Sequence, residues 1–132
     1  MNRKNLFEYK DNKEWVDKRK AKIEEEYEGI QKMIATYGDQ PRGSSSVQDR
    51  LAENLAILLD KKKETLDFAI KLEQDLINID NALLKIEQPY RNILTDVYIE
   101  GKTLVTVAND MNYNYKYMCR QHGEALKKYD EL

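Results

Sequence analysis

The chain contains few of the residues that form catalytic sites, metal sites and disulfides. Its 132 residues include one cysteine, one histidine, two prolines and five glycines. A single cysteine cannot form a disulfide within the chain, which is typical of proteins in a reducing compartment. No long apolar run occurs, and the opening residues MNRKNLFEYKDNKEW lack the apolar core of a signal peptide. We therefore expect a cytoplasmic protein that neither crosses a membrane nor is secreted.

The same scarcity argues against catalysis and metal binding. Cys119 and His122 lie three residues apart, a spacing that could place both on one helical face. A structural metal site needs about four ligands, and a catalytic dyad needs a third group that orients it. The chain has no other cysteine or histidine, and no glycine-rich phosphate loop. We expect a packed thiol and a polar surface ring, with no catalytic residue, metal, cofactor or small-molecule substrate.

Charged and apolar residues make up most of the chain. The sequence is 35% charged and 41% hydrophobic, with a net charge of −2. Such a composition with so little glycine and proline is typical of long helices and predicts an all-α protein. The net charge argues against a uniformly basic nucleic-acid binder. The segment 114–128 is nevertheless locally positive, because four basic residues there face a single glutamate.

Glycine and proline divide the N-terminal two thirds into two helices. The segment YGDQPRGSSSVQD (37–49) has the composition of a loop. Before it, we expect a helix over about 13–36, with Trp15 near its start. Apolar residues at three- and four-residue spacing form its buried stripe: Val16, Ile23, Tyr27, Ile30, Ile34 and Tyr37. The second helix is expected to begin at SVQD (46–49) and to continue for about 40 residues, or ~60 Å. Together they predict a long, coiled-coil-like helical hairpin over residues 1–86.

The second helix carries a heptad pattern whose apolar face is wide. Eight of its ten a and d positions are apolar. From these we take the candidate association residues Leu55, Leu58, Leu72, Leu76, Ile79 and Leu83. Further apolar residues widen the stripe beyond a two-stranded seam: Leu59, Leu66, Ile70, Ile77 and Leu84. A helical hairpin alone cannot bury all of it, so we expect a homo-oligomer or a partner helix; alternatively, the C-terminal segment folds back over the extra stripe.

Residues 87–132 contain the start and end signals of three shorter helices. Pro89 suits a first helical turn and Gly101 a helix end, which predicts a helix over PYRNILTDVYIEG (89–101). Thr103 is a good N-cap for a second helix over TLVTVANDM (103–111). In the following NYN (112–114), the first asparagine can adopt positive φ, the tyrosine can fill the core, and the second asparagine can cap a third helix over about 115–129. A short helix, a tight turn and a longer basic helix are the layout of a DNA-binding helix-turn-helix.

The run PYRNILTDVYIEGKTLVTVANDMNYNYKYMCRQHGEALKK (89–128) resembles region four of bacterial sigma factors. It is more closely similar to small phage-encoded transcriptional regulators of the RinA and ArpU type. The residues that carry the likeness are Pro89, Leu94, Tyr98, Glu100, Gly101, Thr103, Ala108, Met111, Tyr113, RQHG (120–123) and ALKK (125–128). The segment GSSSVQDRLAE (43–53) also looks like the middle of that family. The resemblance implies a cytoplasmic DNA-binding regulator that activates late phage genes or helps to position RNA polymerase at their promoters.

The third helix supplies the candidate contacts to double-stranded DNA. Arginine and glutamine suit bidentate contacts to base edges, whereas lysines further along the helix suit phosphates. The candidate residues are Tyr115, Lys116, Tyr117, Arg120, Gln121, Lys127 and Lys128. Tyr115 and Tyr117 could instead pack against another helix of the chain. Two other functions remain open: a helical protein-interaction module that has lost DNA binding, and a DNA-recognition subunit for genome packaging.

Overall fold

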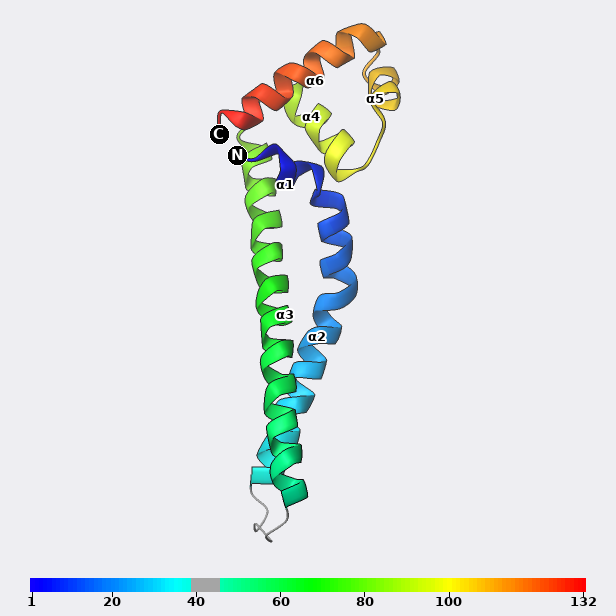
Figure 1. Ribbon diagram of the computed structural model, residues 1–132. Coiled ribbons are helices and arrows are strands. Elements are labelled where there is room, and N and C mark those ends of the chain that lie inside the picture. Colours follow the sequence, from blue (N-terminus) through cyan, green and yellow to red (C-terminus); the bar gives the residue numbers. More distant parts are fainter. Residues whose placement is uncertain (39–45) are drawn as a thin grey trace. The chain divides into compact units, whose positions relative to one another are not determined.

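The computed structural model describes residues 1–38 and 46–132, and Figure 1 shows its elements. Within these residues every regular element is helical and no strand occurs, which confirms the predicted all-α class. The elements are α1 (Arg3–Phe7), α2 (Tyr9–Gly38), α3 (Ser46–Leu84), α4 (Tyr90–Leu94), the π-helical turn η1 (Thr95–Ile99), α5 (Leu104–Asp110) and α6 (Tyr115–Asp130).

The chain forms two compact units. Unit 1 combines residues 1–14 with residues 73–132, and unit 2 consists of residues 15–72. The sequence instead predicted a boundary between residues 86 and 87. The difference has a physical cause, because the first residues of the chain pack against its last helix and the end of α3 rather than forming part of a separate hairpin.

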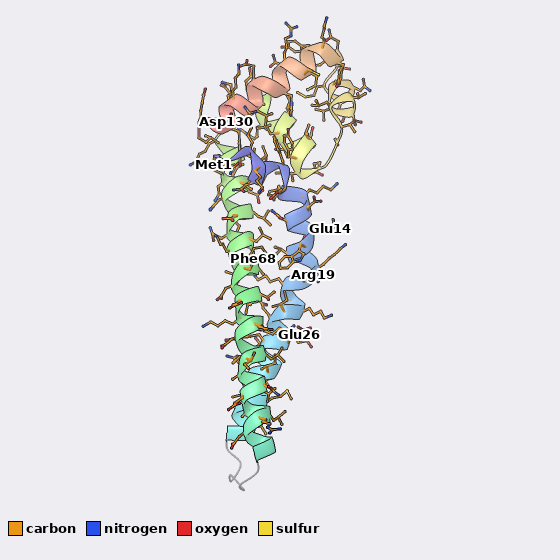
Figure 2. The ribbon with its side chains drawn as sticks, viewed as in Figure 1. Met1, Glu14, Arg19, Glu26, Phe68 and Asp130 are labelled. Carbon is orange, nitrogen blue, oxygen red and sulfur yellow. The ribbon has the colours of Figure 1, made fainter. Side chains whose placement is uncertain are left out.

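Unit 2 is an antiparallel pair formed by parts of α2 and α3. The Trp15 and Phe68 rings meet edge to face, with centroids 5.7 Å apart, and Glu26 forms an ion pair with Lys62. Figure 2 labels Phe68 and Glu26 on the two helices. Residues further along α2 therefore contact residues earlier in α3, as expected for antiparallel helices. Of the predicted apolar stripe, Val16, Ile23 and Ile30 are buried, whereas Tyr27 and Ile34 are half-buried.

Two helix boundaries differ from the sequence prediction. The helix expected to start near residue 13 begins at Tyr9, directly after α1, which the sequence analysis did not predict. The predicted loop over 37–49 falls in part on residues 39–45, which lie outside the described residues. On either side of them, residues 37–38 belong to α2 and residues 46–49 to α3. The helix start predicted within SVQD is thus confirmed.

The short helix α1 ties the first residues to α6 in unit 1. Arg3 donates two hydrogen bonds to the Asp130 carboxylate, from Nε to Oδ1 at 2.8 Å and from Nη2 to Oδ2 at 2.6 Å. Leu6 is fully buried, and the buried Tyr9 donates its hydroxyl to Asp80 of α3. The N-terminal amine of Met1 donates to the last carbonyl, and Figure 2 shows Met1 close to Asp130. The C-terminal end of α6 is thereby held by the first residues of the chain.

The structure places most of the candidate association residues inside the fold. Leu55, Leu76, Ile79 and Leu83 are buried within the single chain, and Leu72 is half-buried. Leu58 alone of the six is exposed. Burial within one chain means that the other five stabilise the monomer's own helix packing. A surface for a second copy would therefore have to use other side chains.

The segment after Pro89 packs against the last two helices, α5 and α6. The predicted single helix is two elements, since α4 gives way to the wider turn of η1, in which Glu100 N–H donates to the Thr95 carbonyl. Gly101 then adopts φ 75°, a backbone conformation that glycine tolerates best, and ends the segment as expected. The end of the flexible Lys10 side chain lies where a Cβ at Gly101 would be, but the positive φ is the stronger reason for glycine here.

Candidate nucleic-acid interface

Two side-chain caps define α5 and α6, and both were predicted. The Thr103 hydroxyl accepts from the Thr106 N–H at 3.2 Å, and the Asn114 side chain accepts from the Tyr117 N–H at 2.8 Å. Asn112 has φ 58° in the turn between the helices. Each cap satisfies an amide that has no partner within its helix, and asparagine adopts positive φ more readily than most residues. The sequence therefore fixes both the starts of the helices and the tight turn that joins them.

A small apolar core holds these elements together. Ile93 of α4, Val107 and Ala108 of α5, and Met118 of α6 form one buried cluster. Tyr113, as predicted, packs against it from the turn, and its N–H donates to the Ala108 carbonyl at 2.8 Å. Because α6 reaches this cluster through Met118, the opposite face of the helix points outward.

The outward face of α6 carries a line of positive charge. Lys116, Arg120 and Lys127 are exposed and follow the four- and seven-residue spacing of one helical face. Beside them, Glu124 forms an exposed ion pair with Lys127 at 3.5 Å. An exposed pair of this kind contributes little and is readily exchanged for another anion. The face can therefore bind a polyanion.

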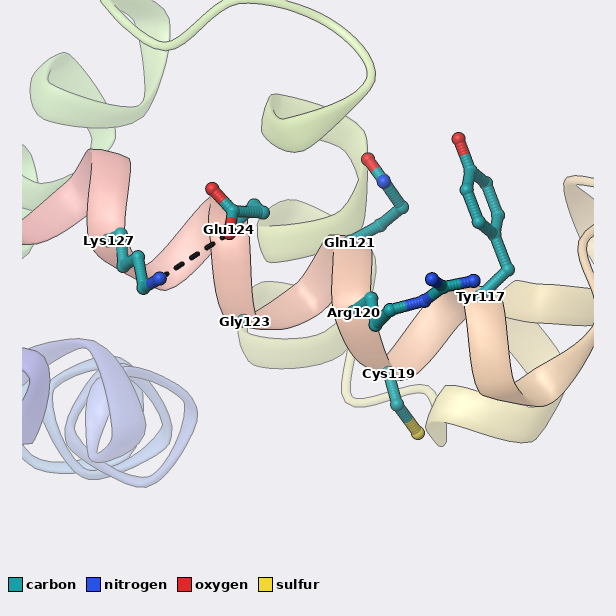
Figure 3. A pocket seen from close by; sticks show the side chains of 7 residues that line it. All are labelled: Tyr117, Cys119, Arg120, Gln121, Gly123, Glu124 and Lys127. Carbon is teal, nitrogen blue, oxygen red and sulfur yellow. Dashed lines mark hydrogen bonds and ion pairs between the residues drawn. The ribbon is translucent and has the colours of Figure 1, made fainter.

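Aromatic contacts orient the central arginine of this line. The Arg120 guanidinium lies over the Tyr117 ring, 5.9 Å from its centroid, and the Tyr117 ring meets Tyr113 edge to face at 4.9 Å. Figure 3 shows Arg120 turned toward Tyr117. Since Tyr113 is itself packed on the core, the contacts run from the core to the guanidinium. Holding a long side chain in place before binding reduces the entropy that binding would cost.

A shallow hollow of about 380 Å³ lies along the same face. Its lining residues, shown in Figure 3, are Tyr117, Cys119, Arg120, Gln121, Gly123, Glu124 and Lys127. Four of the seven predicted contact residues belong to it: Tyr117, Arg120, Gln121 and Lys127. Lys116 lies on the same outward face one turn before Arg120. Tyr115 is exposed, and its hydroxyl is hydrogen-bonded to Cys119, which raises the pKa of that tyrosine. Neither tyrosine is buried against a neighbouring helix.

Lys128 lies apart from the other predicted contact residues. Its ammonium forms an ion pair with Glu87 at 3.0 Å and lies 5.0 Å from the centroid of the Tyr90 ring. The hydrogen bond that the Lys128 ammonium donates to the Glu87 carboxylate raises the pKa of Lys128. These contacts attach α6 to the start of α4, so phosphate binding by Lys128 stays a prediction that competes with an internal partner. The sequence could not show this partner, because Glu87 is 41 positions away.

Sequence reasoning missed two features of the interface. Val105 of α5 is exposed and offers an apolar side chain on the first helix of the pair. Gly123 and Cys119 line the hollow although neither was a predicted contact. The signal that could have found Gly123 was its position in the line Lys116, Arg120, Gly123, Lys127, which is the face opposite Met118.

His122 is not the polar surface ring that the sequence predicted. It is half-buried, and its Nε2 lies 2.7 Å from the Tyr98 hydroxyl in a hydrogen bond between α6 and η1. Tyr98 in turn stacks with Phe7 of α1 at 5.1 Å between centroids. Cys119 is exposed and is therefore not the packed thiol that the sequence predicted. Within the described residues no group of three or more metal-ligating side chains occurs.

We predict that His122 makes unit 1 less stable in mild acid. Burial, and to a lesser degree the nearby Arg3 guanidinium, lowers the pKa of His122 below 6.5 in the folded chain. The unfolded chain then binds more protons between that lowered pKa and about 6.5, so stability must fall as pH falls through this window. Thermal unfolding between pH 7.5 and 5 should show the loss in the wild type and a flatter profile in His122→Gln. Because the chain has one histidine, equal slopes for both proteins would contradict the prediction.

No known protein family model, curated protein or solved structure matches this chain. In the described part of the chain, no helix combines the length and apolar character that crossing a bilayer requires.

Proposed function

We propose that this chain is a sequence-specific, DNA-binding transcriptional regulator that reads double-stranded DNA with α6. In this proposal α5, the turn at 112–114 and α6 are the helix-turn-helix, and residues 87–132 supply the DNA-binding part. The resemblance to sigma region four and to RinA and ArpU regulators extends the proposal to activation of late phage genes, with RNA polymerase as a partner.

The observation that carries the proposal is the oriented cationic line on the outward face of α6. Lys116, Arg120 and Lys127 are exposed on one face, and Arg120 is held over Tyr117. Arginine can donate two hydrogen bonds to guanine, and a helix of this width fits the major groove.

The test is binding by the full-length protein to duplexes selected from a random pool. A sequence-specific reader enriches a defined motif, and its affinity falls steeply with salt because bound phosphates release counterions. Titrations of the selected duplex and a shuffled duplex at two salt concentrations separate the two contributions. If no motif were enriched and no salt-dependent binding appeared, the proposal would be lost. Reporter transcription from a promoter that carries the motif then separates a regulator from a packaging subunit.

Self-association forms a second part of the proposal, with another copy of this chain as the partner. Ile70, Ile77 and Leu84 are exposed at seven-residue intervals along α3, which is the spacing of helix pairing. Two copies would offer two reading helices, and helix-turn-helix dimers bind half-sites ~34 Å apart. The same stripe would serve the alternative function, a helical protein-interaction module.

We predict that replacing Ile77 with Glu lowers self-association without unfolding the chain. The side chain is 45% exposed, so the monomer has little packing to lose there, whereas an apolar contact between copies would gain a buried charge. Sedimentation at high micromolar concentration checks the result. Leu76→Glu is the matched control, since Leu76 is buried and its replacement should unfold the helix pair instead. A monomeric wild type would remove this part of the proposal and leave DNA binding by one copy.

A further inference from the structure

Gly123 has no structural reason to be glycine within the chain itself. It lies in the middle of α6, and its φ is not in the left-handed region that favours glycine. A Cβ built at this position would meet no atom within 4 Å, so no neighbouring element requires its absence. Glycine is the least favourable residue after proline inside a helix, since it loses the most backbone freedom on folding. The fold therefore bears a cost here that alanine would remove.

The surroundings of Gly123 set it apart from another open glycine. Gly29 of α2 also has free space at its Cβ position, but it follows the acidic segment EEEYE (24–28). Gly123 instead lies in the hollow on the outward face of α6, on the line between Arg120 and Lys127. Free space alone is no site. Free space flanked by exposed cations is the shape that a polyanion could enter.

We propose that Gly123 is the closest point of approach between α6 and bound DNA, and that the missing side chain sets how deeply the helix enters the groove. This inference rests on the proposed function. A helix with its side chains is about 10–12 Å across, and the major groove is about 12 Å wide. One added methyl group on the face that meets the groove therefore moves the helix outward. Arg120 and Lys127, which lie on either side of Gly123, would then both be further from the DNA.

The charges around Gly123 favour nucleic acid over a protein partner as the occupant. Arg120 and Lys127 flank it seven residues apart, about 10.5 Å along the helix axis. Glu124, the one carboxylate of the hollow, is already paired with Lys127. Phosphate groups spaced along a strand can exchange with that carboxylate at little cost. An apolar partner helix would offer no anion to Arg120.

Gly123→Ala, with Gly29→Ala as the matched control, tests the inference. Gly29 is exposed and Gly123 half-buried, and both substitutions add a methyl group inside a helix without a clash, so both should raise Tm by a few degrees. In titrations of the full-length protein with its selected duplex, Gly123→Ala should weaken binding about tenfold or more, which corresponds to about 1.4 kcal/mol. Gly29→Ala should bind like the wild type. Gly123→Leu, whose larger side chain fills the hollow, should bind more weakly still.

The outcomes separate this inference from the function on which it rests. If the wild type binds its selected duplex and Gly123→Ala binds equally well or better, the inference is overturned and the proposed function stands. If the wild type binds no duplex, both fall. A more stable yet weaker-binding Gly123→Ala, beside an equally stabilised and fully active Gly29→Ala, supports the inference, because helix propensity alone would affect the two proteins alike.

Discussion

Replacing Met118 with alanine is expected to lower the free energy of unfolding by about 2 to 5 kcal/mol, the usual cost of truncating a large buried side chain. Met118 is fully buried and is the contribution of α6 to the cluster formed with Ile93, Val107 and Ala108. The remaining cluster is small, so a cavity there has few side chains that can collapse into it. Urea unfolding followed by circular dichroism measures the loss.

Met33→Ala is the matched control for Met118→Ala. Met33 lies on α2 and is 47% exposed, so the same truncation there should cost well under 1 kcal/mol. Because Met118 faces the core and Arg120 faces outward, DNA binding by Met118→Ala should survive at temperatures where the variant stays folded. Equal stability of the two variants would show that α6 does not rest on this cluster and would remove the support of the proposed reading helix.

The helices could be predicted largely from local chemistry. Thr103 and Asn114 each accept a hydrogen bond from the amide three residues later, Asn112 adopts positive φ in a turn, and Gly101 ends a segment. Each effect depends on atoms within a few residues, which is why the order and bounds of α5 and α6 followed from the sequence. The helix α1 escaped prediction because it is short and because its contacts, such as the one between Arg3 and Asp130, 127 positions apart, join distant parts of the sequence.

The buried face of α3 was harder to predict than its existence. A heptad pattern shows that a face is apolar and does not show what covers it. Leu76 and Ile77 are adjacent in sequence, yet the first is buried within the chain and the second is exposed. The assignment of each depends on α2 and on the first residues of the chain, which no local window contains. The same limit explains why the internal partners of Lys128 and His122 were missed.

The candidate site combines both kinds of information. Its charge pattern was visible in the sequence, because Arg120 and Lys127 share a face at any ideal helical spacing. Its orientation could also be predicted, because the apolar Met118 and Leu126 mark the opposite face of α6, and the structure buries both. The contact between Arg120 and Tyr117 follows from that orientation. Residues with similar chemistry, such as Lys127 and Lys128, are therefore expected to differ in function.

Replacing Arg120 with alanine is expected to cost about 1 to 3 kcal/mol of binding at the selected site and little on shuffled DNA. The guanidinium is exposed, oriented by Tyr117, and suited to a guanine edge, so its loss should flatten discrimination between sequences. Gln121→Ala should act in the same direction. Anisotropy titrations with the selected duplex and single-base variants of it measure the effect position by position.

Lys127→Ala should weaken DNA binding in a different way from Arg120→Ala. A lysine on a phosphate adds affinity without sequence information, so binding to selected and shuffled duplexes should weaken alike, and the salt slope should fall by about one unit. Lys128→Ala should change the slope less, because its ammonium is already paired with Glu87. Lys63→Ala, on the exposed surface of α3, removes the same charge away from α6 and controls for net charge. If Arg120→Ala and Lys127→Ala proved indistinguishable on every duplex, α6 would bind DNA through charge alone, and the claim of sequence reading would be withdrawn.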